Sequence, residues 1–148
     1  LIDLTGSACP TELMAESVRL PGLTDLMCGE ISISDSIHPD RLSSAHIIPR
    51  GNANARRAMR AIDRLPMIID ALTEAYDLVV VECGAADAAS IARIARAERG
   101  EIILSILRSD EAEIAELLIE FNAQGFEDVL LMTPGQPVSP LGSRSSAA

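Results

Sequence analysis

An acidic side chain follows the most apolar short run in this chain. Residues 78–81 are Leu-Val-Val-Val, and Glu82 comes directly after them. An apolar run without alternation is typical of a strand buried on both faces of a parallel sheet. Ligands of open α/β sheets bind at the carboxyl ends of such strands. Glu82 is therefore a candidate contact for a metal ion or nucleotide, weighed against the simpler interpretation of a solvated carboxylate.

Other reactive side chains point less clearly to chemistry. Cys9, Cys28 and Cys83 are odd in number and lack CxxC spacing, which indicates neither a disulfide framework nor a zinc site. Reduced cytosolic thiols are the simpler account. Cys83 has no histidine near it in sequence, so we interpret it as a small buried residue. His38 and His46 are eight positions apart, and we interpret both as structural or exposed.

The charged residues exclude several classes of function. The chain has no lysine, because all 12 basic residues are arginine. Schiff-base catalysis, a P-loop lysine and a receiver-domain lysine are therefore absent from these residues. The net charge is −10, and such an acidic chain does not favour binding to nucleic-acid backbones or docking on anionic lipid.

The pattern of elements that must position Glu82 alternates between strands and helices. With 148 residues and 48% apolar content, the chain can form one domain with a core. Apolar runs predict strands, and spacings of three and four predict helices, with either a break near Leu65 or a new helix that has Pro66 in its first turn. The candidate helix ends are Thr11, Asp87 and either Ser109 or Asp110 as N-caps, and Gly29 and Gly125 after C-termini. This alternation predicts an α/β fold: a three-layer parallel sheet with helices on both faces. We expect this domain to span 1–133 and 134–148 to be a flexible tail. The predicted strands cover 1–4, 45–48, 78–82, 102–107 and 129–132.

Four segments carry a resemblance to a known family. They read LIDLTGSACP at 1–10, PGLTDLMCG at 21–29, IIPRG at 47–51 and YDLVVVECGAADAA at 76–89. In this order they resemble the deviant-Walker (MinD/ParA-like) P-loop ATPases. They are most similar to the cytoplasmic domains of bacterial exopolysaccharide co-polymerases, of the succinoglycan type, and their tyrosine kinases. The resemblance implies a P-loop NTPase-like fold that begins at the Walker A′ strand, with the phosphate-binding loop upstream.

The resemblance also implies site residues, and some of them depart from the family pattern. Asp3 matches the first acidic position of Walker A′, and the family fold places it near Glu82, which stands where Walker B has Asp. Together they would contact ATP or ADP and Mg²⁺. Thr5 occupies the second acidic position, and the sole tyrosine, Tyr76, precedes a strand. We therefore expect a degenerate nucleotide site, with no catalytic residue, in a regulatory or structural module.

Partners follow from the same resemblance. It implies a periplasmic domain and two membrane helices outside this chain, a place on the cytoplasmic face of the bacterial inner membrane, homo-oligomerisation and contact with polysaccharide export and polymerisation machinery. Two charged helix faces are either solvated or suited to a head-to-tail contact between copies. They are the basic set Arg56, Arg57, Arg60 and Arg64 and the acidic set Glu111, Glu113, Glu116 and Glu120.

Two alternatives stay open. One is an active ATPase or protein tyrosine kinase domain whose P-loop lies upstream of Leu1. The other is a flavodoxin-like binding module without ancestry in this family. Strand order separates them, because the P-loop class places the strand that carries Glu82 beside the strand that carries Asp3 or beside the first, P-loop strand.

Overall fold

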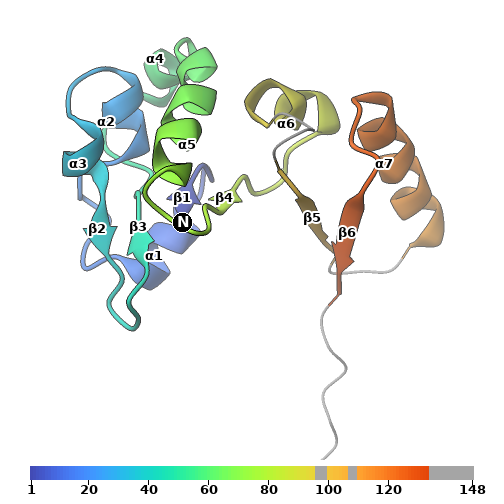
Figure 1. Ribbon diagram of the computed structural model, residues 1–148, viewed down its shortest axis with the longest axis horizontal. Coiled ribbons are helices and arrows are strands. Elements are labelled where there is room, and N and C mark those ends of the chain that lie inside the picture. Colours follow the sequence, from blue (N-terminus) through green and yellow to red (C-terminus); the bar gives the residue numbers. More distant parts are fainter. Residues whose placement is uncertain (96–99, 107–109, 134–148) are drawn as a thin grey trace, which may run out of the picture. The chain divides into compact units, whose positions relative to one another are not determined.

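The computed structural model describes residues 1–95, 100–106 and 110–133. The chain divides by its internal contacts into two units, Leu1–Arg96 (unit 1) and Ala97–Ala148 (unit 2). Figure 1 labels the helices and strands of each. The tail expected at 134–148 lies outside the described residues, so its flexibility stays a prediction.

The sheet of unit 1 is built around the short strand β1 (Ile2–Asp3). On one side β1 pairs in parallel with β4 (Val81–Glu82). On its other side a parallel bridge joins Ile2 to Ile48, directly after β3 (His46–Ile47). The antiparallel partner of β3 is β2 (His38–Pro39), which the sequence pattern did not predict. β1 is therefore an inner strand that depends on distant parts of the chain.

The helices of unit 1 are short, and local sequence signals explain several of their ends. Gly29, with φ of 75°, follows α2, and Pro66 lies in the first turn of α5, as predicted. Asp87 caps α6 by accepting a hydrogen bond from the Ser90 amide at 2.8 Å. The helices are α1 (Cys9–Met14), α2 (Leu23–Met27), α3 (Ile33–Ser36), α4 (Ala55–Met59), the 3₁₀ helix η1 (Ile62–Arg64), α5 (Leu65–Thr73) and α6 (Ala88–Ile94).

The core of unit 1 lies between β1, β3 and the helices, and it differs from the prediction at β4. The expected strand at 78–82 is reduced to two residues, and the expectation of burial on both faces is wrong: Leu78 is 76% exposed and Val80 is 43% exposed. Among the described residues of unit 1, β4 has a strand partner only on its β1 side, so it is an edge strand, and side chains at a sheet edge have fewer neighbours to cover them than those of the inner strand β1. Large apolar side chains that are almost fully buried in this core include Ile2, Leu23, Met27, Ile47, Ile48 and Leu65.

Unit 2 contains one strand–helix–strand arrangement. β5 (Ile102–Ser105) and β6 (Val129–Met132) pair in parallel over four residues each. α7 (Glu111–Ala123) connects them, and Asp110 caps its first turn as predicted. The two parallel strand pairs and their connecting helices confirm the α/β class. No helix within the described residues is long and apolar enough to cross a membrane.

Candidate functional site

The structure brings the two predicted acidic residues to one edge of the sheet. Asp3 and Glu82 are partners in the parallel register of β1 and β4, at the last residue of each strand. Partnered residues of neighbouring strands project from the same face of a sheet. The adjacency that the family resemblance implied is therefore present, and the two carboxylates differ sharply in their surroundings.

The carboxylate of Asp3 is fully buried and bound on both oxygens. Oδ1 accepts hydrogen bonds from the Thr5 amide at 2.9 Å and from the Thr5 hydroxyl at 2.7 Å. Oδ2 accepts from the Thr11 amide at 3.0 Å and from the Thr11 hydroxyl. A carboxylate has about four lone-pair sites. The four donors therefore use all the lone-pair sites of the Asp3 carboxylate. Asp3 stabilises the turn after β1 by binding Thr5 and Thr11.

The carboxylate of Glu82 is exposed and only partly engaged. Its Oε1 accepts a hydrogen bond from the Gly84 amide at 3.2 Å, and its other oxygen has no partner among the described residues. Gly84 has φ of 66°, which a residue without a Cβ adopts easily, so the chain turns sharply after β4. A Cβ at Gly84 would lie 3.6 Å from Thr5 Cγ2, which shows how closely the two turns approach.

These surroundings do not fit a magnesium ion held directly by both carboxylates. Mg²⁺ needs near-octahedral oxygen ligands. Asp3 has no lone pair left for a metal, while the free oxygen of Glu82 can contact an ion or its water. Within the described residues, no three His, Cys, Asp or Glu side chains lie together as a metal-binding group. Glu82 is thus the one predicted site residue that remains available to a ligand.

Thr11 is a central residue of this edge that the sequence interpretation placed wrongly. The spacing predicted Thr11 as a helix N-cap, but α1 begins earlier, after Ala8, which has φ of 58°. Thr11 lies inside α1, where its hydroxyl also accepts a hydrogen bond from the Arg50 amide at 3.0 Å. Its role depends on Asp3, eight residues away, so no local capping signal could have shown it.

A second buried carboxylate, Asp25, supports the neighbouring loop and was not predicted as a site residue. Its Oδ2 accepts hydrogen bonds from the Gly22 amide at 2.8 Å and from the Asn52 amide at 2.9 Å. Asp25 is three positions after Gly22, the N-cap of α2, and binds its amide as the acidic residue of a capping box does, but Gly22 has no side chain to complete the motif, so the sequence does not show it. Asp25 fixes the loop at 49–52, whose Arg50 guanidinium donates to the Gly6 carbonyl oxygen at 2.9 Å.

Cys83 is held as a thiol chiefly by its partial burial, with a further contribution from Glu82. Burial raises the pKa of Cys83 to about 11, and the negative charge of Glu82 adds to the rise. At neutral pH the nucleophilic thiolate is therefore scarce. Cys83 is half-buried, less than the small buried residue expected from the sequence.

We expect iodoacetamide to alkylate Cys83 at least about tenfold more slowly than the exposed Cys9 at pH 8, with a rate that rises as pH approaches 11. Glu82→Gln removes the nearby negative charge, lowers the pKa of Cys83 and should raise its rate about threefold. Peptide mass spectrometry would follow each cysteine separately. Equal rates for Cys83 and Cys9 at pH 8 would contradict the assignment.

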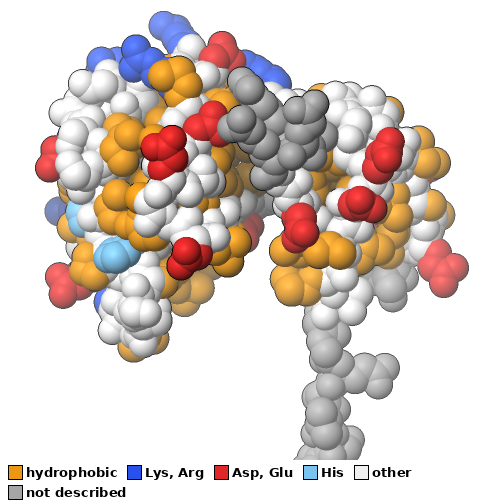
Figure 2. All heavy atoms as spheres, viewed as in Figure 1, with side chains coloured by type: hydrophobic (Ala, Val, Ile, Leu, Met, Phe, Trp, Pro, Cys, Tyr) orange, Lys and Arg blue, Asp and Glu red, His pale blue; other side chains and the backbone are white. Residues whose placement is uncertain are grey.

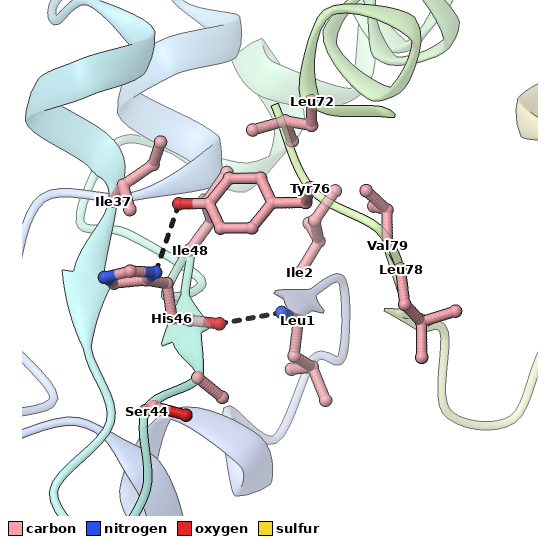
Figure 3. Close-up of a pocket in the computed structure, with 11 residues that line it drawn as sticks. Leu1, Ile2, Ile37, Ser44, His46, Ile48, Leu72, Tyr76, Leu78 and Val79 are labelled. Carbon is pink, nitrogen blue, oxygen red and sulfur yellow. Dashed lines mark hydrogen bonds between the residues drawn. The ribbon is translucent and has the colours of Figure 1, made fainter. Parts of the chain in front are cut away.

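The clearest hollow among the described residues lies away from the two carboxylates. It has a volume of about 140 Å³ and lies at the amino-terminal ends of the parallel strands (Figure 3). Apolar side chains line most of it, including Ile2, Ile48 and Leu72. The Tyr76 hydroxyl and His46 Nδ1 lie 3.2 Å apart at its rim. It is therefore distinct from the edge where the carboxylates meet.

Comparisons with known proteins place this arrangement in a fold class. No protein-family model and no curated protein matches the chain. Solved structures do match. The kinase domain of the Escherichia coli tyrosine kinase ETK covers 99% of the chain with a TM-score of 0.75 and 18% identity. The VpsO kinase domain covers 90% with a TM-score of 0.72 and 19% identity. MinD from Pyrococcus horikoshii OT3, complexed with Mg-ADP, covers 88% with a TM-score of 0.67 and 18% identity. The chain has a P-loop NTPase-like fold.

Two facts refine the P-loop NTPase-like assignment. The chain spans 69% of the VpsO chain but only 59% of the ETK chain and 53% of the MinD chain. At these identities the likeness concerns the fold. The pairing of β1 with β4 is one of the two arrangements expected of the P-loop class. With Ile48 on the other side of β1, the parallel strands of unit 1 lie in the order second, first, third, which a flavodoxin-like sheet shares. Strand order therefore does not separate the two alternatives, and the P-loop NTPase-like assignment rests on the solved structures.

Proposed function

We propose that this chain belongs to the cytoplasmic kinase-like domain of a bacterial exopolysaccharide biosynthesis and transport protein, of the succinoglycan chain-length type, and that its role is regulatory or structural. Three of the similar structures are kinase domains, those of VpsO, BceF and ETK. They support a kinase-like fold. The link to exopolysaccharide rests on the four sequence segments that resemble the co-polymerases.

The saturation of Asp3 is the observation that carries the proposal of a degenerate nucleotide site. Thr5 stands at the second acidic position of the family, and its amide and hydroxyl occupy Oδ1 of Asp3. Thr5, which stands in place of the second acidic residue of the family, therefore also binds the first acidic residue, Asp3. Phosphoryl transfer depends on positioning metal and positive charge around phosphate. An edge with one buried, fully bound carboxylate and no lysine is poorly equipped for that chemistry.

The second candidate is an active ATPase or protein tyrosine kinase whose P-loop lies upstream, with ATP or ADP and Mg²⁺ as ligands. The exposed, half-free carboxylate of Glu82 at the carboxyl end of β4 favours it. In that case Glu82 would hold a water molecule on the metal rather than bind it directly.

For partners we propose self-association into a homo-oligomer and contact with the polysaccharide export and polymerisation machinery. Attachment to the cytoplasmic face of the inner membrane would use segments outside this chain. Nucleic acid is not a proposed partner, because the net charge is −10.

A nucleotide titration separates the two candidates. We expect fluorescent ATP and ADP, with Mg²⁺, to show no saturable binding up to millimolar concentration in the native protein. The informative variant is Glu82→Gln, because Asp3 variants would lose the turn after β1 and confuse folding with binding. Circular dichroism would confirm folding, and the ETK kinase domain would serve as the positive control. Micromolar binding that falls at least tenfold in Glu82→Gln would instead establish a working site.

A further inference from the structure

A small basic face on α4 has no partner within the chain. Arg56, Met59 and Arg60 follow helical spacing, so their side chains share one face. Both arginines are exposed, Met59 is 55% exposed, and neither guanidinium has a partner among the described residues. Figure 2 shows basic side chains gathered over this part of unit 1. We call Arg56, Met59 and Arg60 the basic face.

The two free guanidinium groups stand out because the other arginines nearby are already bound. Arg57 pairs with Glu30 at 2.6 Å, and Arg64 donates to the Met27 carbonyl oxygen at 3.2 Å. Of the four arginines in the predicted cluster, Arg57 and Arg64 bind residues at and after the end of α2. The other two, Arg56 and Arg60, have no side-chain partner among the described residues. Arg41, Arg50 and Arg93 also have protein partners, while Arg19, exposed and without a side-chain partner among the described residues, lies outside α4.

A complementary face lies on α7 of unit 2. Glu113, Glu116 and Glu120 follow spacings of three and four, and Leu117 lies among them. All three glutamates are exposed without a partner among the described residues, and Leu117 is 38% exposed. We call these four residues the acidic face. Each face therefore has a central apolar side chain with charges of one sign around it.

We propose that the basic face of one copy docks on the acidic face of a second copy of this chain. This inference rests on the self-association proposed above and names its surfaces. Met59 and Leu117 would form the dry centre, while the opposite charges would set the register and exclude like-charged pairings. Since the two faces differ, the contact is head-to-tail, and its repetition builds a ring or a filament.

The size of the faces sets the expected strength. Two such short helical faces bury less than the roughly 1,000 Å² of a stable interface, so the contact is weak and depends on protein concentration. Exposed ion pairs are screened by salt. Self-association should therefore decrease as the salt concentration rises.

Charge reversal with rescue tests the proposal in the native protein. Sedimentation velocity over a concentration series should show at least tenfold weaker association for Arg56→Glu/Arg60→Glu and for Glu116→Arg/Glu120→Arg. Combining all four changes should restore association to within about threefold of the wild type, because the charges are then complementary again. Arg19→Glu and Glu101→Arg, singly, are controls outside the two faces, since both residues are exposed and their side chains lack partners among the described residues. Each reverses one charge where the test variants reverse two.

Three results would overturn the proposal. The first is a wild-type protein that stays monomeric at every concentration tested at low salt. The second is wild-type association in both reversed variants, and the third is a failure of the combined variant to recover although circular dichroism shows it folded. The nucleotide titration is interpreted independently of the sedimentation experiment. A working nucleotide site would reject the degenerate-site function without affecting the docking result, and a failed docking test would leave the degenerate-site function standing.

Discussion

Replacing Asp3 with alanine is expected to lower the free energy of unfolding by about 4 kcal/mol. Asp3 accepts four hydrogen bonds in a fully buried position, two from Thr5 and two from Thr11. Alanine leaves these donors without an acceptor, and each costs about 1 kcal/mol or more. Domains are stable by roughly 5–15 kcal/mol, so the variant would be close to unfolding. Urea denaturation followed by circular dichroism would measure the change.

A graded control accompanies this prediction. Thr5→Val removes one donor and keeps the Thr5 amide bond to Asp3, so its cost should be about 1 kcal/mol. If Asp3→Ala cost no more than Thr5→Val, the carboxylate would not organise this turn. The argument that the nucleotide site is degenerate would then lose its main support.

Gly22→Ala is expected to lower the free energy of unfolding by about 3 kcal/mol, for steric reasons. A Cβ at Gly22 would lie 2.1 Å from the Pro49 carbonyl oxygen and 2.9 Å from the Gly51 nitrogen. Both are backbone atoms, which cannot rotate away as a side chain does. Relief requires separating residues 22–23 from the loop at 49–52, which breaks the 2.8 Å hydrogen bond from the Leu23 amide to Pro49. Thermal unfolding would report the loss.

Gly6→Ala is the matched control for this substitution. No atom lies within 4 Å of a Cβ built at Gly6, so alanine should change stability by less than about 0.5 kcal/mol. A Gly22→Ala variant as stable as Gly6→Ala would mean that the loop can move away at little cost. In that case Asp25 would not be holding it tightly.

Features with local causes were predictable from the sequence. Asp87 and Asp110 cap their helices because each aspartate bonds amides two or three residues ahead. Gly125, with φ of 91°, follows the end of α7 for the same kind of reason. The strand at 129–132 was predicted at the observed bounds, since an apolar run between turn residues is also a local signal.

Features set by distant partners were not predictable in this way. The run at 78–81 is apolar, but its burial depends on its place in the sheet and on what packs over it, and in unit 1 the described residues leave β4 as an edge strand. The local sequence predicts Thr11 as an N-cap, but its side chain binds Asp3 in β1, and a local pattern does not show that partner. The adjacency of Asp3 and Glu82 came from the family resemblance, since composition and spacing say nothing about the order of strands.

The position of β1 has a consequence for synthesis of the protein. β1 lies at the start of this chain, but its two neighbours are Ile48 and β4, which the ribosome makes much later. At about 5–20 residues per second, roughly 80 residues take about 4–16 s. Until residue 48 has been made, the apolar first residues have neither strand partner, and until β4 has been made they have only one. Their later pairing requires closing long loops. Unit 1 therefore cannot complete its sheet during translation until β4 has been made, and until then its first strand is a segment for chaperones to protect.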